Sequence, residues 1–358
     1  MEAVMELIPV RQTERKIQPY REVVDVQAKV VNIQAEMVNL DITTGHSKQF
    51  IEANTNETTL QHLKNDCVVP VFSKDNELTI SHVSFIESVF EAAVKVFPHE
   101  CITSPEIRVS HVIKGRTPDA VHKSVNDLLD ADKTIYYERM AFVMEIPAIS
   151  EVINGNPLSL TIGGVRSYNH ENLYSKKTFE KFKVFIGFKN MVCCNLCIST
   201  DGYKEEMRVI SHLELLQQVV ALIQCYNVSK HLNLMNSFNN HYLTEHQFAQ
   251  MIGKSKLYQC LPLKEKKLLS NLELTGCHIN TIAKNYYRDE AFSKDRNNAI
   301  NLWNVYNLFT SANKGSYIDT FLDRAANATE FIGGISKALN GQNGYSFSAS
   351  IANATTCR

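Results

Sequence analysis

The stretch FKVFIGFKNMVCCNLCISTDGYKEEMRVISHLELLQQVVALI, residues 182–223, decides the fold class because its hydrophobic period changes within it. Phe182, Val184, Ile186 and Phe188 share one parity, as in a strand with one buried face. After Asp201-Gly202 the apolar residues recur every three or four positions, as in an amphipathic helix: Met207, Ile210, Leu213, Leu216, Val219, Val220 and Ile223. We therefore predict strands almost wholly before residue 203 and helices from there to about 340.

The flanking sequence extends both halves of this pattern. Apolar or alternating runs predict strands at 68–72, 78–83, 107–113, 141–146, 158–168 and 191–199, the first two as a hairpin. Helices are predicted over about 85–94 and from Pro118 to about Ala131. Downstream, Thr244-x-x-Gln247 is a capping box for a short helix that Gly253 would end, and Ser316-x-x-Asp319 opens a helix that ends at Gly341.

These elements predict an α+β fold, with a mostly antiparallel sheet and helices in the N-terminal half and an all-helical C-terminal half. We divide the chain into a flexible N-terminal arm (1–35), an α+β domain (36–203), a helical domain (204–340) and a loose tail (341–358). The arm contains two prolines, and the tail is rich in Ser, Asn and Ala.

Composition excludes several classes of protein. Of the 358 residues 44% are apolar and 21% charged, which is typical of a globular chain. With 37 basic and 38 acidic residues the net charge is -1, so binding to nucleic acid would need a local basic patch. Nine scattered cysteines, no signal-peptide pattern and no apolar run long enough for a bilayer predict a cytoplasmic protein without a membrane partner.

The basic and aromatic stretch from residue 166 to residue 189 is the candidate binding site. Six cations against two glutamates give it a charge of +4. Cations that meet phosphates and rings that stack on bases suit single-stranded nucleic acid. The candidate nucleic-acid-binding residues are Arg166, Tyr168, Tyr174, Lys176, Lys177, Lys181, Lys183 and Lys189. The alternative is a strand with an apolar inner face and a solvated outer face.

Other candidate sites have weaker patterns. Cys193-Cys194-x-x-Cys197 has metal-ligand spacing but lacks a second pair, so buried thiols explain it better than zinc. Gly163-Gly164 lacks the rest of a phosphate loop and predicts close backbone approach. A helix-turn-helix can be placed on 268–287, with Gly276 in the turn and Ile279, Ile282 and Ala283 inward. We predict no catalytic residue, metal or cofactor.

Several sequence segments resemble those of one protein family. They are Phe50–Thr55, Val71–Glu77, Tyr136–Phe142, Gly163–Asn169, Phe185–Asn190, and Leu302–Thr310 followed by Ala312-Asn313-Lys314. Together they are similar to domain-of-unknown-function family 3871 of bacterial mobile elements, over about residues 40–340. A looser similarity joins 140–200 and 300–312 to the phage/plasmid-related protein family, through Cys193-Cys194-Asn195-Leu196. The resemblance implies a gene of a prophage, plasmid or conjugative element and supplies no catalytic residues.

The expected function is therefore that of a non-enzymatic accessory protein of such an element that contacts nucleic acid, with single-stranded DNA as the candidate ligand. Two alternatives stay open. The first is a protein-binding module acting against a host defence or regulatory protein, which fits the neutral net charge. The second is a metal-dependent nuclease whose carboxylates come from distant positions in the sequence. A spatial cluster of Asp and Glu around a Lys would favour it.

Overall fold

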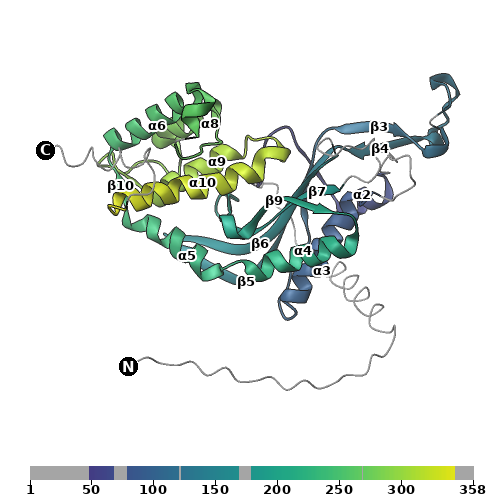
Figure 1. The fold of residues 1–358 in the computed structure, drawn as a ribbon, viewed down its shortest axis with the longest axis horizontal. Helices are drawn as coiled ribbons and strands as arrows, with labels where there is room; N and C mark the ends of the chain where they lie inside the picture. The colour runs from purple at the N-terminus through teal and green to yellow at the C-terminus, as the bar shows by residue number, and fades with distance from the viewer. Residues whose placement is uncertain (1–47, 68–78, 121, 169–178, 268, 343–358) are drawn as a thin grey trace, which may run out of the picture. The chain divides into compact units, whose positions relative to one another are not determined.

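A computed structural model describes residues 48–67, 79–120, 122–168, 179–267 and 269–342 (Figure 1). The predicted arm, 1–35, lies outside these residues, as does nearly all of the predicted tail. The residues from 48 onward form one compact unit, which is the part considered below.

An antiparallel sheet forms the centre of this unit. Its seven strands among the described residues are β1 (Asn56–Thr58), β2 (Glu106–Val109), β5 (Arg139–Ile153), β6 (Asn156–Ser167), β7 (Glu180–Asn190), β8 (Leu196–Cys197) and β9 (Tyr203–Val209). The order is β1-β2-β5-β6-β7, and β8 and β9 both pair with β7. Two shorter pairs are separate from it: β3 (Val112–Arg116) with β4 (Lys133–Tyr137), and β10 (Tyr242–Leu243) with β11 (Ile300–Asn301).

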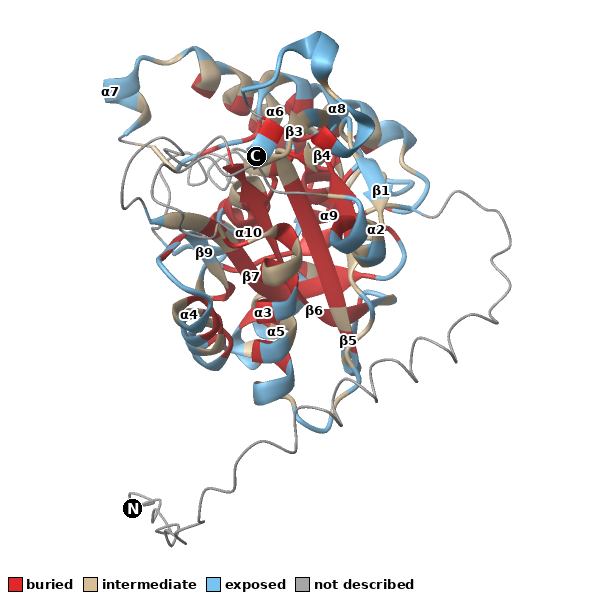
Figure 2. Ribbon diagram, turned by 90° about the vertical axis from the view of Figure 1, so that its right-hand side faces the viewer, coloured by how far each residue is buried: buried red, intermediate tan, exposed pale blue. Residues whose placement is uncertain are grey.

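Helices cover both faces of the sheet, because its central strands are apolar on both sides (Figure 2). Helices α3 (His82–Val96) and α4 (His212–Cys225) pack on the face of Phe142 and Val184. Helix α10 (Ile318–Leu339) packs on the opposite face, on Val143 and Phe185. A helix from the C-terminal part thus covers the face of β7 that the sequence predicted to be solvated.

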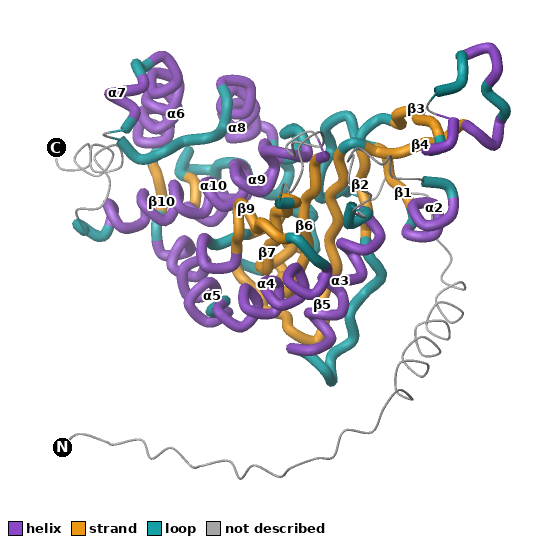
Figure 3. Tube along the Cα trace, turned by 45° about the vertical axis from the view of Figure 1, so that its right-hand side comes forward, coloured by secondary structure: helices purple, strands orange, loops and turns teal. Residues whose placement is uncertain are grey.

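The other helices in the described part of the chain are α2 (Leu60–Asn65), α5 (Val228–Ser237), α6 (Glu245–Cys260), α7 (Leu263–Lys266), α8 (Gly276–Arg288) and α9 (Leu302–Asn313). Single 3-10 turns occur at Pro118–Ala120, Val125–Asp127, Asp130–Asp132, Thr200–Gly202 and Phe238–Asn240. In Figure 3, α6, α7 and α8 lie on one side of the unit and the β3–β4 pair lies on the other.

The α+β class is confirmed, but the all-helical C-terminal half is only partly present. Strand β9 begins at Tyr203, and the short strands β10 and β11 lie further along the chain. In β9, Met207 and Val209 are buried by alternation, and only later residues follow a helical period. One hydrophobic core also includes residues from both sides of 203, such as Phe142 and Trp303. The division into domains at 203 stays a prediction.

Several predicted elements are correct in type. The predicted strand 141–146 lies within β5, which is longer. The predicted strand 158–168 corresponds to β6, which begins two residues earlier and ends one residue earlier. The predicted helix over 85–94 lies within α3. The helix predicted to begin near Ser316 is α10. The Thr244 capping box is present. Gly341, at φ +73°, follows α10 in the left-handed conformation that glycine tolerates.

Other predicted elements are wrong. The helix from Pro118 to Ala131 is a series of short turns, in which the side chain of Asp132 accepts from the Leu129 amide. Helix α6 continues through Gly253 to Cys260. The strand at 78–83 is absent from its described part, because Ser81 caps a helix that starts at His82. The strand at 107–113 is divided into β2 and β3. Residues 68–78 lie outside the described part.

Gly163 and Gly164 lie within β6, where close approach explains them. A Cβ on Gly164 would lie 2.5 Å from Cζ of Phe85 on α3, and one on Gly163 would clash with the Phe142 carbonyl. The prediction of close backbone approach is confirmed. Among the described residues, no helix has the length and apolar character needed to cross a membrane.

Candidate functional site

The predicted binding residues Arg166 and Tyr168 are buried. The Arg166 guanidinium lies 4.6 Å from the ring of Tyr168 and 4.4 Å from that of Phe182, and it donates to Glu180 and to the Ile80 carbonyl. Arg166 is fully buried and Tyr168 is 1% exposed. Neither can meet a phosphate or a base in this conformation, so these two residues form part of the core.

The lysines of β7 are paired with carboxylates. Lys189 is buried, with Nζ 2.8 Å from Glu106 and 3.0 Å from Glu145. Burial by itself lowers the pKa of Lys189, but these two carboxylates raise it overall. Lys181 is partly exposed and lies 2.7 Å from Glu206. Hydrogen bonds from Arg208 and Lys181 lower the pKa of Glu206 to about 2, so this carboxylate stays charged.

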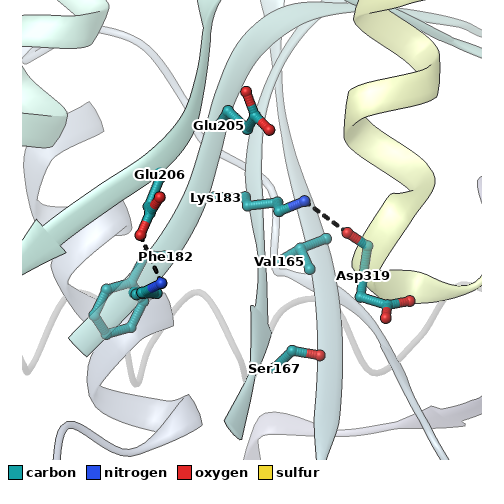
Figure 4. A pocket seen from close by; sticks show the side chains of 8 residues that line it. Val165, Ser167, Phe182, Lys183, Glu205, Glu206 and Asp319 are labelled. Atoms are coloured by element: carbon teal, nitrogen blue, oxygen red, sulfur yellow. Dashed lines mark hydrogen bonds and ion pairs between the residues drawn. The ribbon is translucent and has the colours of Figure 1, made fainter. Parts of the chain in front are cut away.

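Lys183 points into a hollow between the sheet and α10 (Figure 4). Its Nζ donates to the Asp319 carbonyl at 2.7 Å and pairs with Asp323, whose carboxylate also accepts from the Tyr203 hydroxyl. The hollow measures about 230 Å³ and is lined by Val165, Ser167, Lys181, Phe182, Lys183, Glu205, Glu206 and Asp319. The structure therefore brings Lys181 and Lys183 together among acids.

The remaining predicted site residues, Tyr174, Lys176 and Lys177, lie outside the described part of the chain. Because the described cations of this stretch are paired or buried, the basic surface does not extend over β7. The acids around Lys183 are the cluster that a nuclease would need. However, the described residues hold no group of three or more His, Cys, Asp or Glu arranged to bind a metal ion.

Cys193 and Cys197 are core thiols. Burial raises the pKa of Cys193 to about 11 and that of Cys197 to about 12. Cys194, at φ 58°, turns the chain between β7 and β8. The turn is fixed to α9 by hydrogen bonds from Asn190 to the Asn307 side chain at 3.1 Å and from Asn195 to the Asn307 carbonyl at 3.1 Å.

Helix α8 presents a different polar surface. Ile279 and Ile282 are buried, as the helix-turn-helix interpretation predicted, although Gly276 begins the helix and does not lie in a turn. The exposed residues lie at three- and four-residue spacing: Cys277, Asn280, Thr281, Lys284, Tyr287 and Arg288. We call these six residues the α8 face. The α8 face contains no carboxylate, two cations and several hydrogen-bond donors.

A loop, residues 294–299, is fixed beside the C-terminal half of α8. The Lys294 amide donates to the Tyr286 carbonyl at 2.9 Å, and the Tyr286 hydroxyl donates to the Asn298 carbonyl at 2.7 Å. The Lys294 ammonium also lies 4.9 Å from the Tyr287 ring centroid. The loop therefore holds exposed Arg296, Asn297 and Asn298 next to the α8 face.

Of the carboxylates near the α8 face, Asp295, Asp289 and Glu245 are engaged in local structure, and Glu290, two residues beyond Arg288, is exposed. Asp295 accepts from the amides of Asn297 and Ala299, both at 2.8 Å. Asp289 accepts from the Ala291 and Phe292 amides after the helix ends. Glu245 accepts from the Tyr287 hydroxyl at 2.7 Å. Residues 242–299 carry nine basic and six acidic side chains, a charge of +3 in a chain of net charge -1.

The fold and these surfaces define an α+β protein with helices on both faces of an antiparallel sheet and a positively charged helical region. Residues 32–348 match the family model described as "Domain of unknown function, B. Theta Gene description (DUF3871)", and the chain belongs to this family. No curated protein and no solved structure matches the chain.

Proposed function

We propose that this protein binds duplex nucleic acid through the α8 face and the 294–299 loop, without catalysing a reaction on it. The observation that carries the proposal is the carboxylate-free α8 face. Asn, Thr, Lys and Arg are side chains that donate to phosphates and base edges. An exposed α-helix fits the major groove, and the adjacent loop would contact the backbone.

The positive charge of +3 over residues 242–299 lies on α6 and α7, since residues 254–267 alone carry +4, whereas residues 268–299, which include α8 and its loop, carry four basic and four acidic side chains. Helix α6 contacts α8 through a 2.7 Å hydrogen bond from Lys256 to the Gly276 carbonyl, so its lysines supply a local attraction to phosphate next to the α8 face. We propose a duplex because Tyr168, which was expected to stack on single-stranded bases, is buried. The resemblance to mobile-element proteins suggests that the DNA belongs to a phage, plasmid or conjugative element.

The test is the affinity for a fluorescent 20-base-pair duplex as a function of salt. Each phosphate contact contributes about 0.9 to the slope of log affinity against log salt. Replacing Lys284, Arg288 and Arg296 by Ala should therefore flatten the slope by about 2–3 units and weaken binding at 50 mM salt.

A matched control removes the same charge elsewhere. Lys204, Lys230 and Lys337 are exposed on β9, α5 and α10, and their triple Ala variant should retain nearly full affinity. Equal losses of affinity in the two triple variants would show that net charge, and not the α8 face, determines binding. Absence of duplex binding by the unmodified protein at 50 mM salt would overturn the proposal.

A further inference from the structure

The β3–β4 pair and the loop that it carries, residues 112–137, project as a finger outside the seven-stranded sheet (Figure 1). The finger is internally braced. Lys123 pairs with Asp132 at 2.8 Å, and Arg116 donates to the Lys123 carbonyl at 2.7 Å. These contacts join the start, the middle and the end of the loop to one another.

Two aliphatic side chains are held in solvent on this loop. Val125 is 73% exposed and Leu129 is 67% exposed. One exposed aliphatic side chain is ordinary, but here two lie four residues apart on one braced, projecting loop. Residues 117–133 carry four aspartates and two lysines, a charge of -2. The end of the finger is thus apolar and acidic.

A second surface has the complementary character. We call it the α6–α7 corner, residues 254–267. Leu263 is 78% exposed, the highest value among the large apolar side chains in the described residues, and Leu257 is 67% exposed. The corner carries five lysines and one glutamate, a charge of +4. Lys264 and Lys267 are both exposed. The corner is thus apolar and basic.

The two surfaces cannot meet within one molecule. The finger and α7 lie on opposite sides of the unit in Figure 3, with the central sheet between them. We propose that the end of the finger of one molecule docks on the α6–α7 corner of a second copy of this chain. Burial of four aliphatic side chains and the opposite charges would stabilise this contact.

This contact is heterologous, because it joins two different surfaces. Each molecule would keep a free finger at one end and a free corner at the other, so the copies would form rings or filaments. The α8 face is not part of the contact. The five lysines of the corner also account for the positive charge of residues 242–299, so only the substitutions on the α8 face and its loop separate the two proposals. An assembly would align several α8 faces.

The test uses sedimentation velocity of nuclease-treated protein over a range from about 1 to 100 µM, with circular dichroism to verify folding. The unmodified protein should associate with rising concentration. Asp119→Lys/Asp130→Lys in the finger and Lys264→Glu/Lys267→Glu in the corner should each give monomers. These side chains are exposed, so the substitutions should leave the fold intact.

Mixing the two monomeric variants distinguishes the proposed contact from a symmetric one. Each variant retains one unaltered surface, while the substituted finger has a charge of +2 and the substituted corner a charge of 0. The unaltered finger of the corner variant meets the unaltered corner of the finger variant, which is the one complementary pair in the mixture. The mixture should therefore form one-to-one dimers while each variant alone stays monomeric.

Aliphatic substitutions supply the matched control. Val125→Ser/Leu129→Ser should abolish association, whereas Val152→Ser, at a 61% exposed position at the far end of β5, should have no effect. Lys284→Ala/Arg288→Ala/Arg296→Ala should associate normally, which separates this inference from the proposed function. A monomeric unmodified protein at 100 µM, or normal association by Val125→Ser/Leu129→Ser, would overturn the proposal.

Discussion

Replacing Glu180 by Ala should strongly destabilise the protein, because the fully buried Arg166 would lose its carboxylate partner. The Glu180 oxygens also accept from the Ile80 amide at 3.0 and 3.1 Å. Removing one partner of a buried ion pair typically costs about 3–5 kcal/mol. In a domain of this kind that corresponds to a decrease of on the order of 10 °C in the melting temperature.

The assay is thermal unfolding followed by circular dichroism, with urea unfolding as a second measure. Lys181→Ala is the control from the same strand, since its pair with Glu206 is partly exposed and should contribute less than about 1 kcal/mol. A loss below about 1 kcal/mol for Glu180→Ala would contradict the buried ion pair. It would mean that Arg166 is solvated and available to a ligand, as the sequence alone suggested.

Three further predictions follow from the fold. Burial lowers the pKa of His82 to about 3 and that of His231 to about 4. Both histidines therefore stay neutral in the folded protein at pH 5, whereas in the unfolded chain they become protonated as the pH falls below about 6.5. Stability should therefore fall by roughly 2 kcal/mol per histidine from pH 7 to pH 5 in urea titrations, and a pH-independent midpoint would contradict this. Gly164→Ala should destabilise the protein because the added Cβ would meet Phe85. Gly253 has open space around it inside α6, so Gly253→Ala should stabilise the protein by roughly 0.5–1 kcal/mol in the same assay. The reverse order of stabilities would contradict this packing. Asn307→Leu would remove the side-chain acceptor of the buried Asn190 and Asn195 amides, so it should lower the free energy of unfolding in urea by roughly 1–3 kcal/mol. An unchanged free energy of unfolding would show that the turn does not depend on the Asn307 side chain.

The sequence predicts local structure well where one pattern dominates. The apolar run in β5, the alternation in β6 and β7 and the helical spacing in α3 and α10 are visible without tertiary information. The turns at 118–132 were mistaken for a helix, because the side chain of Asp132 binds a backbone amide there and competes with helical hydrogen bonds. Strand β9 was missed because its alternation is short and runs directly into the pattern of α4.

The environment of the predicted binding residues could not be read from the sequence. Lys183 lies on the outer face of β7, but α10 covers that face with residues that are 136–140 positions away in the chain. Lys189 finds its two carboxylates on β2 and β5. The α8 face was partly visible, since Ile279 and Ile282 marked the buried side of the helix.

Photo-crosslinking to duplex DNA would show which surface of the protein contacts nucleic acid. Benzoylphenylalanine would be placed singly at Asn280 and Thr281 on the α8 face, at Lys181 on β7, and at exposed Gln217 on α4 as a control. If the α8 face binds the duplex, positions 280 and 281 should crosslink, and positions 181 and 217 should give no signal above background. Crosslinks from position 181 with none from 280 or 281 would contradict it.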